Sequence, residues 1–209
     1  MKKFLFISDF DGTMTSQDFF LQIMYRYQHN RVFSNNWKSG FDLLSDVFDS
    51  INLSESDLQR EIEYIPLDPY FVNTVKLVRK YGGDFLILSA GCKYYIERKL
   101  KSEGMFDIDI IANDGVYENG GIKLLRNAND RFYSEKFGID KEKVVRYLKD
   151  KYETIAYAGD SWVDFDACRI CDFKFSKGKL DNILSMFVID HYSFKNFSDI
   201  TDILKEKFM

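Results

Sequence analysis

The sequence predicts an α/β fold, a doubly wound, Rossmann-like parallel sheet with a helical cap inserted after the first strand. Short apolar runs alternate with amphipathic segments, which is typical of parallel strands buried on both faces and joined by right-handed crossover helices. One long stretch, residues 16–69, has helical patterns and no convincing strand. With 209 residues, 45% of them apolar, the chain can bury one sizeable core and carry a modest insertion.

The strands of the sheet are predicted from short runs of apolar residues. Four of these runs are clear, at residues 4–7, 85–88, 108–111 and 155–158, and a fifth strand is expected at 187–189. Apolar residues at helical spacing predict helices over 70–81, around Ile96 and Leu100 with a stop at Gly104, and over 141–151. Strands and helices therefore alternate along the chain, as a doubly wound sheet requires.

Two stretches interrupt this alternation. Residues 16–69 are predicted to form a helical cap, so that the core consists of residues 1–15 and 70–209. A cap in this position would act as a lid over a site at the end of the first strand. The second interruption, residues 116–124, contains Asn119-Gly120-Gly121 and predicts a β-hairpin, a smaller addition to the fold.

The charge balance and the cysteine count bear on partners and location. The chain has 29 basic and 33 acidic residues, and a net charge of -4 gives no positive field to hold a phosphate backbone, so no nucleic-acid partner is expected. No apolar run approaches the roughly 18 residues that a membrane helix needs. Three cysteines, an odd number, suit a reducing compartment, and we expect a cytoplasmic protein. The sequence leaves the oligomeric state open.

Carboxylates follow the predicted strands at the points where the strands end. Asp9 and Asp11 follow the first strand, and Asp160 and Asp164 follow the run at 155–158. Ligands bind beyond the carboxyl ends of parallel strands, so these four side chains are expected to converge on one crevice. Such a cluster needs a counterion, because like charges raise one another's pKa. Oxygen ligands without His or Cys suit Mg²⁺ better than Zn²⁺.

The first two carboxylates are expected to have different roles. Strand side chains alternate, so Asp9 and Asp11 would project to the same side and address one reacting group. We assign Asp9 as a nucleophile toward phosphorus, which gives an aspartyl phosphate, and Asp11 as the acid/base for the leaving oxygen and for water. Gly12 allows a sharp turn after them, and Thr13 offers a donor to phosphoryl oxygens.

The remaining phosphate contacts are predicted from a turn and a lysine. After the second strand, Ser89 with Ala90 and Gly91 forms a small-residue turn with donors for the phosphate. A cation is also expected opposite the metal, and three lysines compete for this place: Lys136, Lys141 and Lys143. We choose Lys141, because it begins an apolar-periodic helix that leads into the strand before Gly159.

Together these patterns resemble the haloacid dehalogenase superfamily of phosphatases. Its signatures are a strand ending in Asp-x-Asp-Gly-Thr, a strand ending in Ser or Thr, a lysine, and Gly-Asp-Ser-x-x-Asp, which occur here at residues 6–13, 86–91, 141 and 159–164. The resemblance implies Mg²⁺ bound by the Asp9 carboxylate, the Asp11 main-chain carbonyl and Asp160. Asp164 would be a further ligand or a close partner of one.

Within the superfamily, the helical insertion resembles the cap of the phosphoserine phosphatase-like branch. Residues 9–15, 89–91 and 141–144 most resemble the methionine-salvage phosphatases of that branch. Asp18 falls where relatives carry an acidic residue at the cap hinge. Phosphoserine phosphatases usually have an arginine in the middle of the cap, but residues 39–48 include no basic residue, which argues against phosphoserine as the substrate.

The sequence thus favours a Mg²⁺-dependent phosphatase that hydrolyses a small-molecule phosphomonoester through an aspartyl phosphate. Three alternatives stay open at this stage: a signalling or binding module that accepts phosphate on Asp9, a phosphotransferase on the same fold, and a carbon-halogen hydrolase. A phosphate-accepting module needs neither an acid/base at Asp11 nor a large cap, and both features weigh against it. A carbon-halogen hydrolase has no leaving oxygen to protonate, so Asp11 would have no role in it. Cys168 and Cys171 are expected to be buried free thiols.

Overall fold

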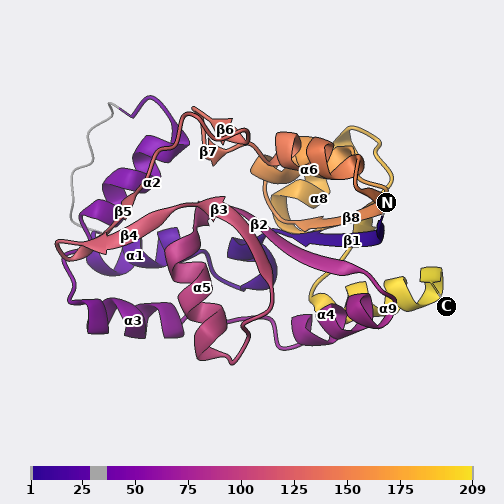
Figure 1. Cartoon of the computed structure of the whole chain (residues 1–209), viewed down its shortest axis with the longest axis horizontal. Coiled ribbons are helices and arrows are strands. Elements are labelled where there is room, and N and C mark those ends of the chain that lie inside the picture. The colour runs from indigo at the N-terminus through magenta and orange to yellow at the C-terminus, as the bar shows by residue number, and fades with distance from the viewer. Residues whose placement is uncertain (1, 29–36, 209) are drawn as a thin grey trace.

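The computed structural model describes residues 2–28 and 37–208, and within them it confirms the predicted α/β class. Its centre is a parallel six-stranded sheet with the order β10-β9-β8-β1-β2-β3 (Figure 1). The strands of this sheet are β1 (Lys2–Ser8), β2 (Asp84–Cys92), β3 (Asp109–Asn113), β8 (Tyr152–Gly159), β9 (Phe173–Ser176) and β10 (Tyr192–Ser193). β1 lies in the middle, with later strands added on both sides, as a doubly wound sheet requires.

Helices cover both faces of the sheet because its strands are apolar on both faces. Phe4 and Phe6 of β1 belong to the core shared with one set of helices, α4 (Phe71–Lys80), α5 (Lys93–Ser102) and α9 (Phe197–Phe208). Leu5 and Ile7 belong to the core on the opposite face, under α6 (Lys141–Lys149), α7 (Phe165–Arg169) and α8 (Gly178–Met186). Alternating side chains of a single strand thus enter two separate cores.

The four clear apolar runs form strands as predicted, but the fifth predicted strand is wrong. Phe187 ends α8, and Val188 has a left-handed backbone (φ 56°) and is 90% exposed. The outer positions of the sheet are taken instead by β9 and β10. Lys174 interrupts the apolar pattern of β9, so this strand has no clear signal in the sequence. The run at 187–189 is apolar, but no neighbouring strand pairs with it in the sheet.

The inserted segment forms three helices, α1 (Phe19–Tyr27), α2 (Gly40–Asp49) and α3 (Glu55–Glu63). Each begins at a residue whose side chain accepts a backbone N–H from the first turn: Asp18, Ser39 and Ser54. At the base of the segment, Thr15 pairs with Leu67 in an antiparallel bridge. The boundaries of the cap stay a prediction, and residues 29–36 of it lie outside the described part of the chain.

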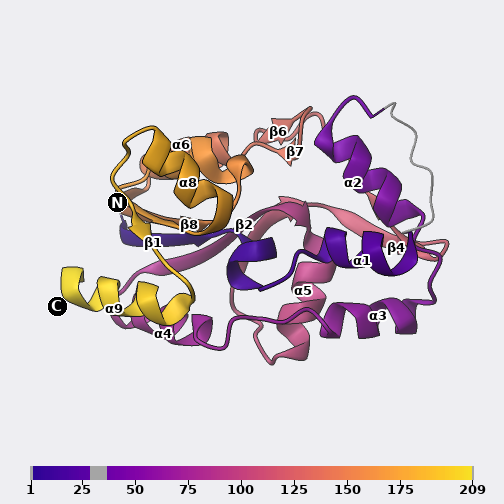
Figure 2. The ribbon, with the colours of Figure 1, turned by 180° about the vertical axis from the view of Figure 1, so that it is seen from behind.

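The predicted hairpin is confirmed as β4 (Gly115–Glu118) and β5 (Gly121–Leu124), and it supports the cap. Asn119 and Gly120 both have positive φ, as a two-residue hairpin turn requires. Gly120 accepts a hydrogen bond from the backbone N–H of Leu53, and the Tyr117 hydroxyl donates to the Leu53 carbonyl. Figure 2 shows the hairpin beside α1 and α2. A second short hairpin, β6 (Tyr133–Ser134) and β7 (Gly138–Ile139), lies between α2 and α6.

Among the described helices, none combines the length and the apolar character needed to cross a lipid bilayer. The three cysteines are free and buried, as expected for Cys168 and Cys171.

Candidate active site

The candidate site lies at the carboxyl ends of β1 and β8, which are neighbours in the middle of the sheet. Ser8 pairs with Ala158 in parallel register, and the backbone N–H of Asp9 donates to the Ala158 carbonyl at 2.9 Å. The chain continues from β1 to one side of the sheet and from β8 to the other, so a crevice opens between the two strand ends. Asp9 follows β1 and Asp160 follows β8, so both carboxylates lie at this crevice.

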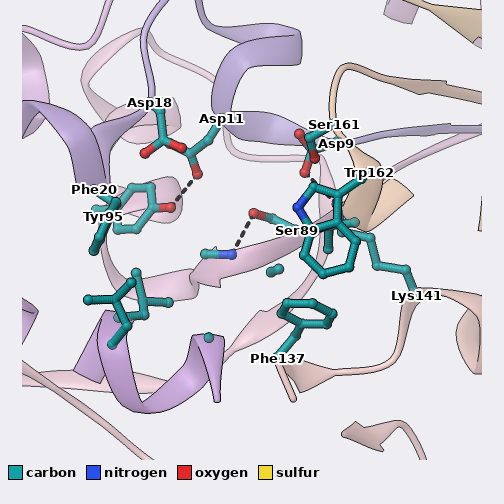
Figure 3. Close-up of a pocket in the computed structure, with 16 residues that line it drawn as sticks. Asp9, Asp11, Asp18, Phe20, Ser89, Tyr95, Phe137, Lys141, Ser161 and Trp162 are labelled. Carbon is teal, nitrogen blue, oxygen red and sulfur yellow. Dashed lines mark hydrogen bonds and ion pairs between the residues drawn. The ribbon is translucent and has the colours of Figure 1, made fainter. Parts of the chain in front are cut away.

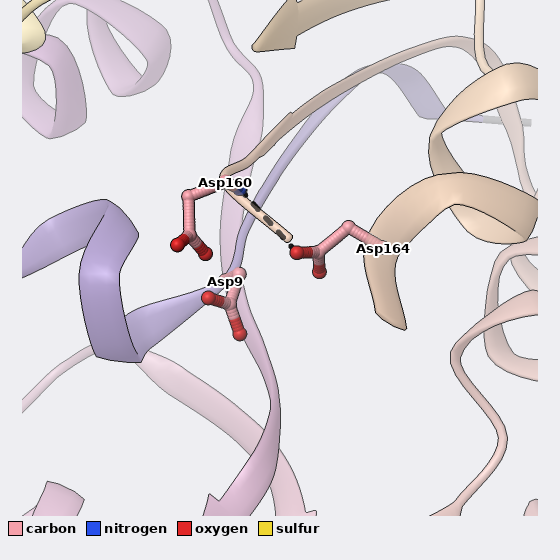
Figure 4. A group of neighbouring side chains, drawn as sticks. All are labelled: Asp9, Asp160 and Asp164. Atoms are coloured by element: carbon pink, nitrogen blue, oxygen red, sulfur yellow. Dashed lines mark hydrogen bonds between the residues drawn. The ribbon is translucent and has the colours of Figure 1, made fainter. Parts of the chain in front are cut away.

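Three carboxylates meet in the crevice (Figure 4). One carboxylate oxygen from each of Asp9, Asp160 and Asp164 lies within 4.8 Å of the other two. Burial raises the pKa of Asp9 well above its usual value, and burial together with the charge of Asp164 raises the pKa of Asp160 to about 6. A cluster of oxygen ligands whose charged forms are disfavoured by burial fits a hard divalent cation.

Lys141 is the lysine that reaches this cluster. Its Nζ donates to Oδ1 of Asp9 and to Oδ1 of Asp164, both at 2.6 Å, from the first residue of α6. Burial alone would lower the pKa of Lys141, but the charges of Asp164 and Asp9 outweigh it and keep the pKa above its usual value. The other two lysines lie elsewhere: Lys143 bonds the Tyr133 carbonyl, and Lys136 lies over the Trp162 ring.

Asp164 is saturated with hydrogen bonds from neighbouring groups. Its Oδ1 accepts from Lys141 and from the Tyr157 hydroxyl at 2.8 Å, and its Oδ2 accepts from the backbone N–H and the hydroxyl of Ser161. Asp164 therefore orients Lys141 and the turn that carries Asp160. Its predicted role as a metal ligand stays a prediction.

Asp11 reaches the same pocket as Asp9 from the tight turn that follows β1, and the backbone of both residues is extended (Asp11 φ -69°, ψ 125°). This turn comprises residues Phe10–Met14 (η1), in which Gly12 has φ 76°. A Cβ at Gly12 would lie 2.5 Å from Oδ2 of Asp160, so only glycine fits this approach. Burial, with the nearby charge of Asp18, raises the pKa of Asp11 to about 7.

Of the predicted phosphate-binding residues, Ser89, Ala90 and Gly91 line the pocket, whereas Thr13 contacts a carboxylate. Ser89, Ala90 and Gly91 line the pocket at the carboxyl end of β2, where the strand pairing with β3 shifts register, and the Ser89 hydroxyl accepts the backbone N–H of Gly91 at 2.9 Å. Thr13 is fully buried, and its hydroxyl donates to Oδ1 of Asp160 at 3.3 Å. Thr13 thus contacts a carboxylate of the cluster, and its contact with a phosphate stays a prediction.

The pocket in front of these residues is a cavity of about 350 Å³ (Figure 3). Its inner end is lined by Asp9, Asp11, Lys141 and residues 89–91. Its outer part is apolar, and the cap and the core both contribute to it: Phe20, Leu43 and Leu44 come from α1 and α2, and Phe137 and Trp162 come from the core. The Phe137 and Trp162 rings pack edge to face with centroids 5.2 Å apart.

Sequence reasoning missed three polar side chains at this site. Tyr95 of α5 donates to Asp11, Tyr157 of β8 donates to Asp164, and Lys177 donates from its Nζ to the Thr13 carbonyl at 2.9 Å. Burial lowers the pKa of Lys177. Lys177 directly follows β9, so recognising that strand would have identified it by the same strand-end rule. The tyrosines are part of apolar runs and gave no separate signal.

Comparison with known proteins agrees with this geometry. The family model for haloacid dehalogenase-like hydrolases matches residues 6–169. A 2-hydroxy-3-keto-5-methylthiopentenyl-1-phosphate phosphatase from Exiguobacterium sibiricum is 25% identical over 209 residues, covering 95% of each chain. Pdp3-interacting factor 1 from Schizosaccharomyces pombe is 26% identical over 224 residues, covering 98% of this chain and 95% of that protein.

A solved structure described as a phospho-aspartyl intermediate analogue of phosphoserine phosphatase has the same fold. Its TM-score is 0.68 at 16% identity, and the match covers 99% of both chains. The resemblance seen in the motifs is thus confirmed, and so is the prediction of a phosphatase enzyme at the level of the family and its named relatives. The match over residues 6–169, which include the carboxylates and Lys141, shows that this chain belongs to the haloacid dehalogenase-like hydrolase family.

Proposed function

We propose that this protein is a Mg²⁺-dependent phosphatase that hydrolyses a small-molecule phosphomonoester through an aspartyl phosphate on Asp9. The observation that carries the proposal is the position of Asp9, whose carboxylate is held by Lys141 and lies beside Asp160 and Asp164 at the floor of a pocket. A buried nucleophile between a cation and a carboxylate cluster is the arrangement that phosphoryl transfer requires.

The carboxylates fit a bound Mg²⁺ ion by their chemistry and their spacing. Asp9 and Asp160 would hold the ion with the main-chain carbonyl of Asp11, and Asp164 would bind it or orient the turn that does. The bound ion would supply positive charge beside the phosphoryl oxygens.

The chain's own residues account for the proton and bond changes. A carboxylate oxygen of Asp9 attacks phosphorus, the bond from phosphorus to the ester oxygen breaks, and Asp11 gives its proton to that leaving oxygen. Asp11 then takes a proton from a water molecule, whose oxygen attacks phosphorus and releases phosphate and free Asp9. A pKa of about 7 lets Asp11 hold a proton in the first step and accept one in the second. Ser89 and Lys141 would bind phosphoryl oxygens throughout.

The outer part of the pocket favours an ester with an apolar, uncharged remainder. Phe20, Leu43 and Leu44 face it from the cap, and Lys141 is the one basic side chain among the described residues of the lining. A substrate carboxylate, as in phosphoserine, would find no partner among them, and a buried unpaired charge is costly. The relatives named for a methylthiopentenyl phosphate are consistent with this preference.

The proposal is tested by a screen of metabolite phosphates with Mg²⁺, which includes phosphoserine and methionine-salvage esters, with phosphate release as the readout. We expect turnover to be highest for an uncharged, apolar ester and low for phosphoserine. Acid quenching during turnover should trap a phosphoenzyme that Asp9→Asn lacks. Failure to release phosphate from any ester in the panel would contradict a phosphatase.

Two alternatives give different results in the same experiment. A signalling module would form a phosphoenzyme that persists for minutes, and a phosphotransferase would pass the phosphoryl group to an added alcohol in preference to water. The acid/base candidate Asp11 in the pocket weighs against the first, because acceptance alone needs no proton transfer to a leaving group. A cytoplasmic location and the lack of a nucleic-acid partner stay predictions.

A further inference from the structure

The carboxylate of Asp11 is held between the core and the cap. Its Oδ1 accepts the backbone N–H of Phe19, the first residue of the cap helix α1, at 3.0 Å. Its Oδ2 accepts the hydroxyl of Tyr95, which comes from α5 in the core. Figure 3 shows the Tyr95 hydroxyl pointing at Asp11 along the wall of the pocket. One donor therefore belongs to the inserted helical segment, and the other belongs to the core.

The ring of Tyr95 is fixed by aromatic packing at the junction of core and cap. The side chain is fully buried, and its ring lies 4.6 Å from Phe19 and 5.8 Å from Phe48, centroid to centroid. Phe10, next to the catalytic candidates, packs on it at 6.2 Å. A buried phenol in such surroundings needs a hydrogen-bond partner, and Asp11 is the partner within reach.

The backbone at Gly91 leaves room for the hydrogen bond between Tyr95 and Asp11. A Cβ at Gly91 would overlap the Tyr95 hydroxyl and would lie 2.8 Å from Oδ2 of Asp11. The last part of β2 therefore approaches the hydrogen bond so closely that no other residue fits at position 91 without displacing it.

We propose that Tyr95 is a positioning residue for Asp11: its hydroxyl keeps the Asp11 carboxylate turned toward the leaving-group side of the pocket. This inference rests on the proposed function, in which Asp11 protonates the leaving oxygen. Without the hydroxyl, Asp11 would keep its bond to Phe19 and would be oriented by the cap alone. Misplacement of an acid by about 1 Å can cost on the order of 10²-fold in rate.

The test compares two esters in the Tyr95→Phe variant. An alkyl ester such as pentyl phosphate needs a proton on its leaving oxygen, whereas p-nitrophenyl phosphate releases a stable anion without one. We expect kcat/KM, which covers the steps up to formation of the phosphoenzyme, to fall about 10- to 100-fold for pentyl phosphate. For p-nitrophenyl phosphate it should stay within about twofold of the wild type, because its leaving group does not need the acid.

A matched control is available one residue earlier. Tyr94 is also a tyrosine of α5, and its hydroxyl donates to Glu55 at 3.2 Å and not to a residue of the pocket. Tyr94→Phe should leave both kcat/KM values within about twofold of wild type.

A double-mutant cycle keeps the test decisive if Tyr95→Phe proves unstable. In the neutral Asp11→Asn background no buried charge is left unpaired, and adding Tyr95→Phe should then change kcat/KM for pentyl phosphate by less than about twofold. An equal loss on both esters, or an undiminished effect of Tyr95→Phe in Asp11→Asn, would overturn the inference while the proposed function stands. A wild-type protein that hydrolyses neither ester would refute the proposed function and this inference with it.

Discussion

The two ends of the pocket are built on different physical principles. At the inner end, Asp9, Asp164 and Lys141 are buried and hold one another by charged hydrogen bonds of 2.6 Å. At the outer end, Phe20 from the cap and Trp162 from the core form an apolar wall, and Trp162 stays half-exposed. The inner end holds the charged groups of the proposed chemistry, and we expect substitutions at the outer end to leave these groups undisturbed. Four predictions test this division, from the largest expected effect to the smallest.

The inner end should tolerate no change at the nucleophile. Asp9→Asn removes the attacking carboxylate, so turnover of p-nitrophenyl phosphate with Mg²⁺ should fall by at least about 10³-fold. Circular dichroism is the control for folding, because an asparagine fits the same space. A variant that keeps a near-normal rate would show that another residue is the nucleophile.

Removal of the Lys141 side chain should lower the free energy of unfolding. Lys141→Ala leaves the carboxylates of Asp9 and Asp164 buried without their cation, and breaking such a buried pair costs about 3–5 kcal/mol. Urea unfolding in metal-free buffer measures this change. Lys143→Ala, an exposed lysine on the same helix, is the matched control and should cost under about 0.5 kcal/mol. Equal stability of the two variants would show that the Lys141 bonds contribute little to folding.

Without bound metal, the stability of the folded protein should depend on pH through the carboxylates of the inner end. The pKa of Asp160 is raised to about 6 in the folded protein, so between about pH 4 and pH 6 the folded state binds more protons than the unfolded state. The metal-free protein should therefore lose stability as the pH rises through this window. Mg²⁺ binds the charged carboxylates, so the increase in Tm that it causes should be larger at pH 7.5 than at pH 5.

At a Mg²⁺ concentration of 100 times Kd the expected stabilisation is about 2.7 kcal/mol, or roughly 5–10 °C for a chain of this size. Differential scanning fluorimetry with Mg²⁺ and with a chelator measures it. The same Tm with and without Mg²⁺ at pH 7.5 would argue against a metal site at Asp9 and Asp160.

The outer end should affect selectivity and little else. Trp162→Ala removes apolar contact area, so kcat/KM for pentyl phosphate should fall about three- to tenfold while that for methyl phosphate stays within about twofold. Steady-state kinetics on the two esters measures the difference. A similar loss on both esters would mean that Trp162 serves the phosphate end of the pocket.

The elements that the sequence predicted well are those whose signal is local. β1, β2 and β8 each contain a short apolar run. Asp9 and Asp160 directly follow β1 and β8, and Ser89 follows the apolar run within β2, so the sequence pattern also locates the candidate residues. The prediction at 187–189 failed because an apolar run says nothing about whether a neighbouring strand is there to pair with it. Val188 lies instead in an exposed turn, and the Lys174 that interrupts β9 concealed a true strand.

The sequence by itself determined which residues follow each strand, and with them the carboxylates of the inner end and three candidate lysines. Only the tertiary structure decided which lysine is held by Asp9, how Asp11 is turned, and what lines the outer pocket. The physical reason is the length of chain between the partners: Tyr95 and Asp11, or Lys141 and Asp9, are far apart in sequence and meet only when helices pack on the sheet. No local pattern encodes that packing.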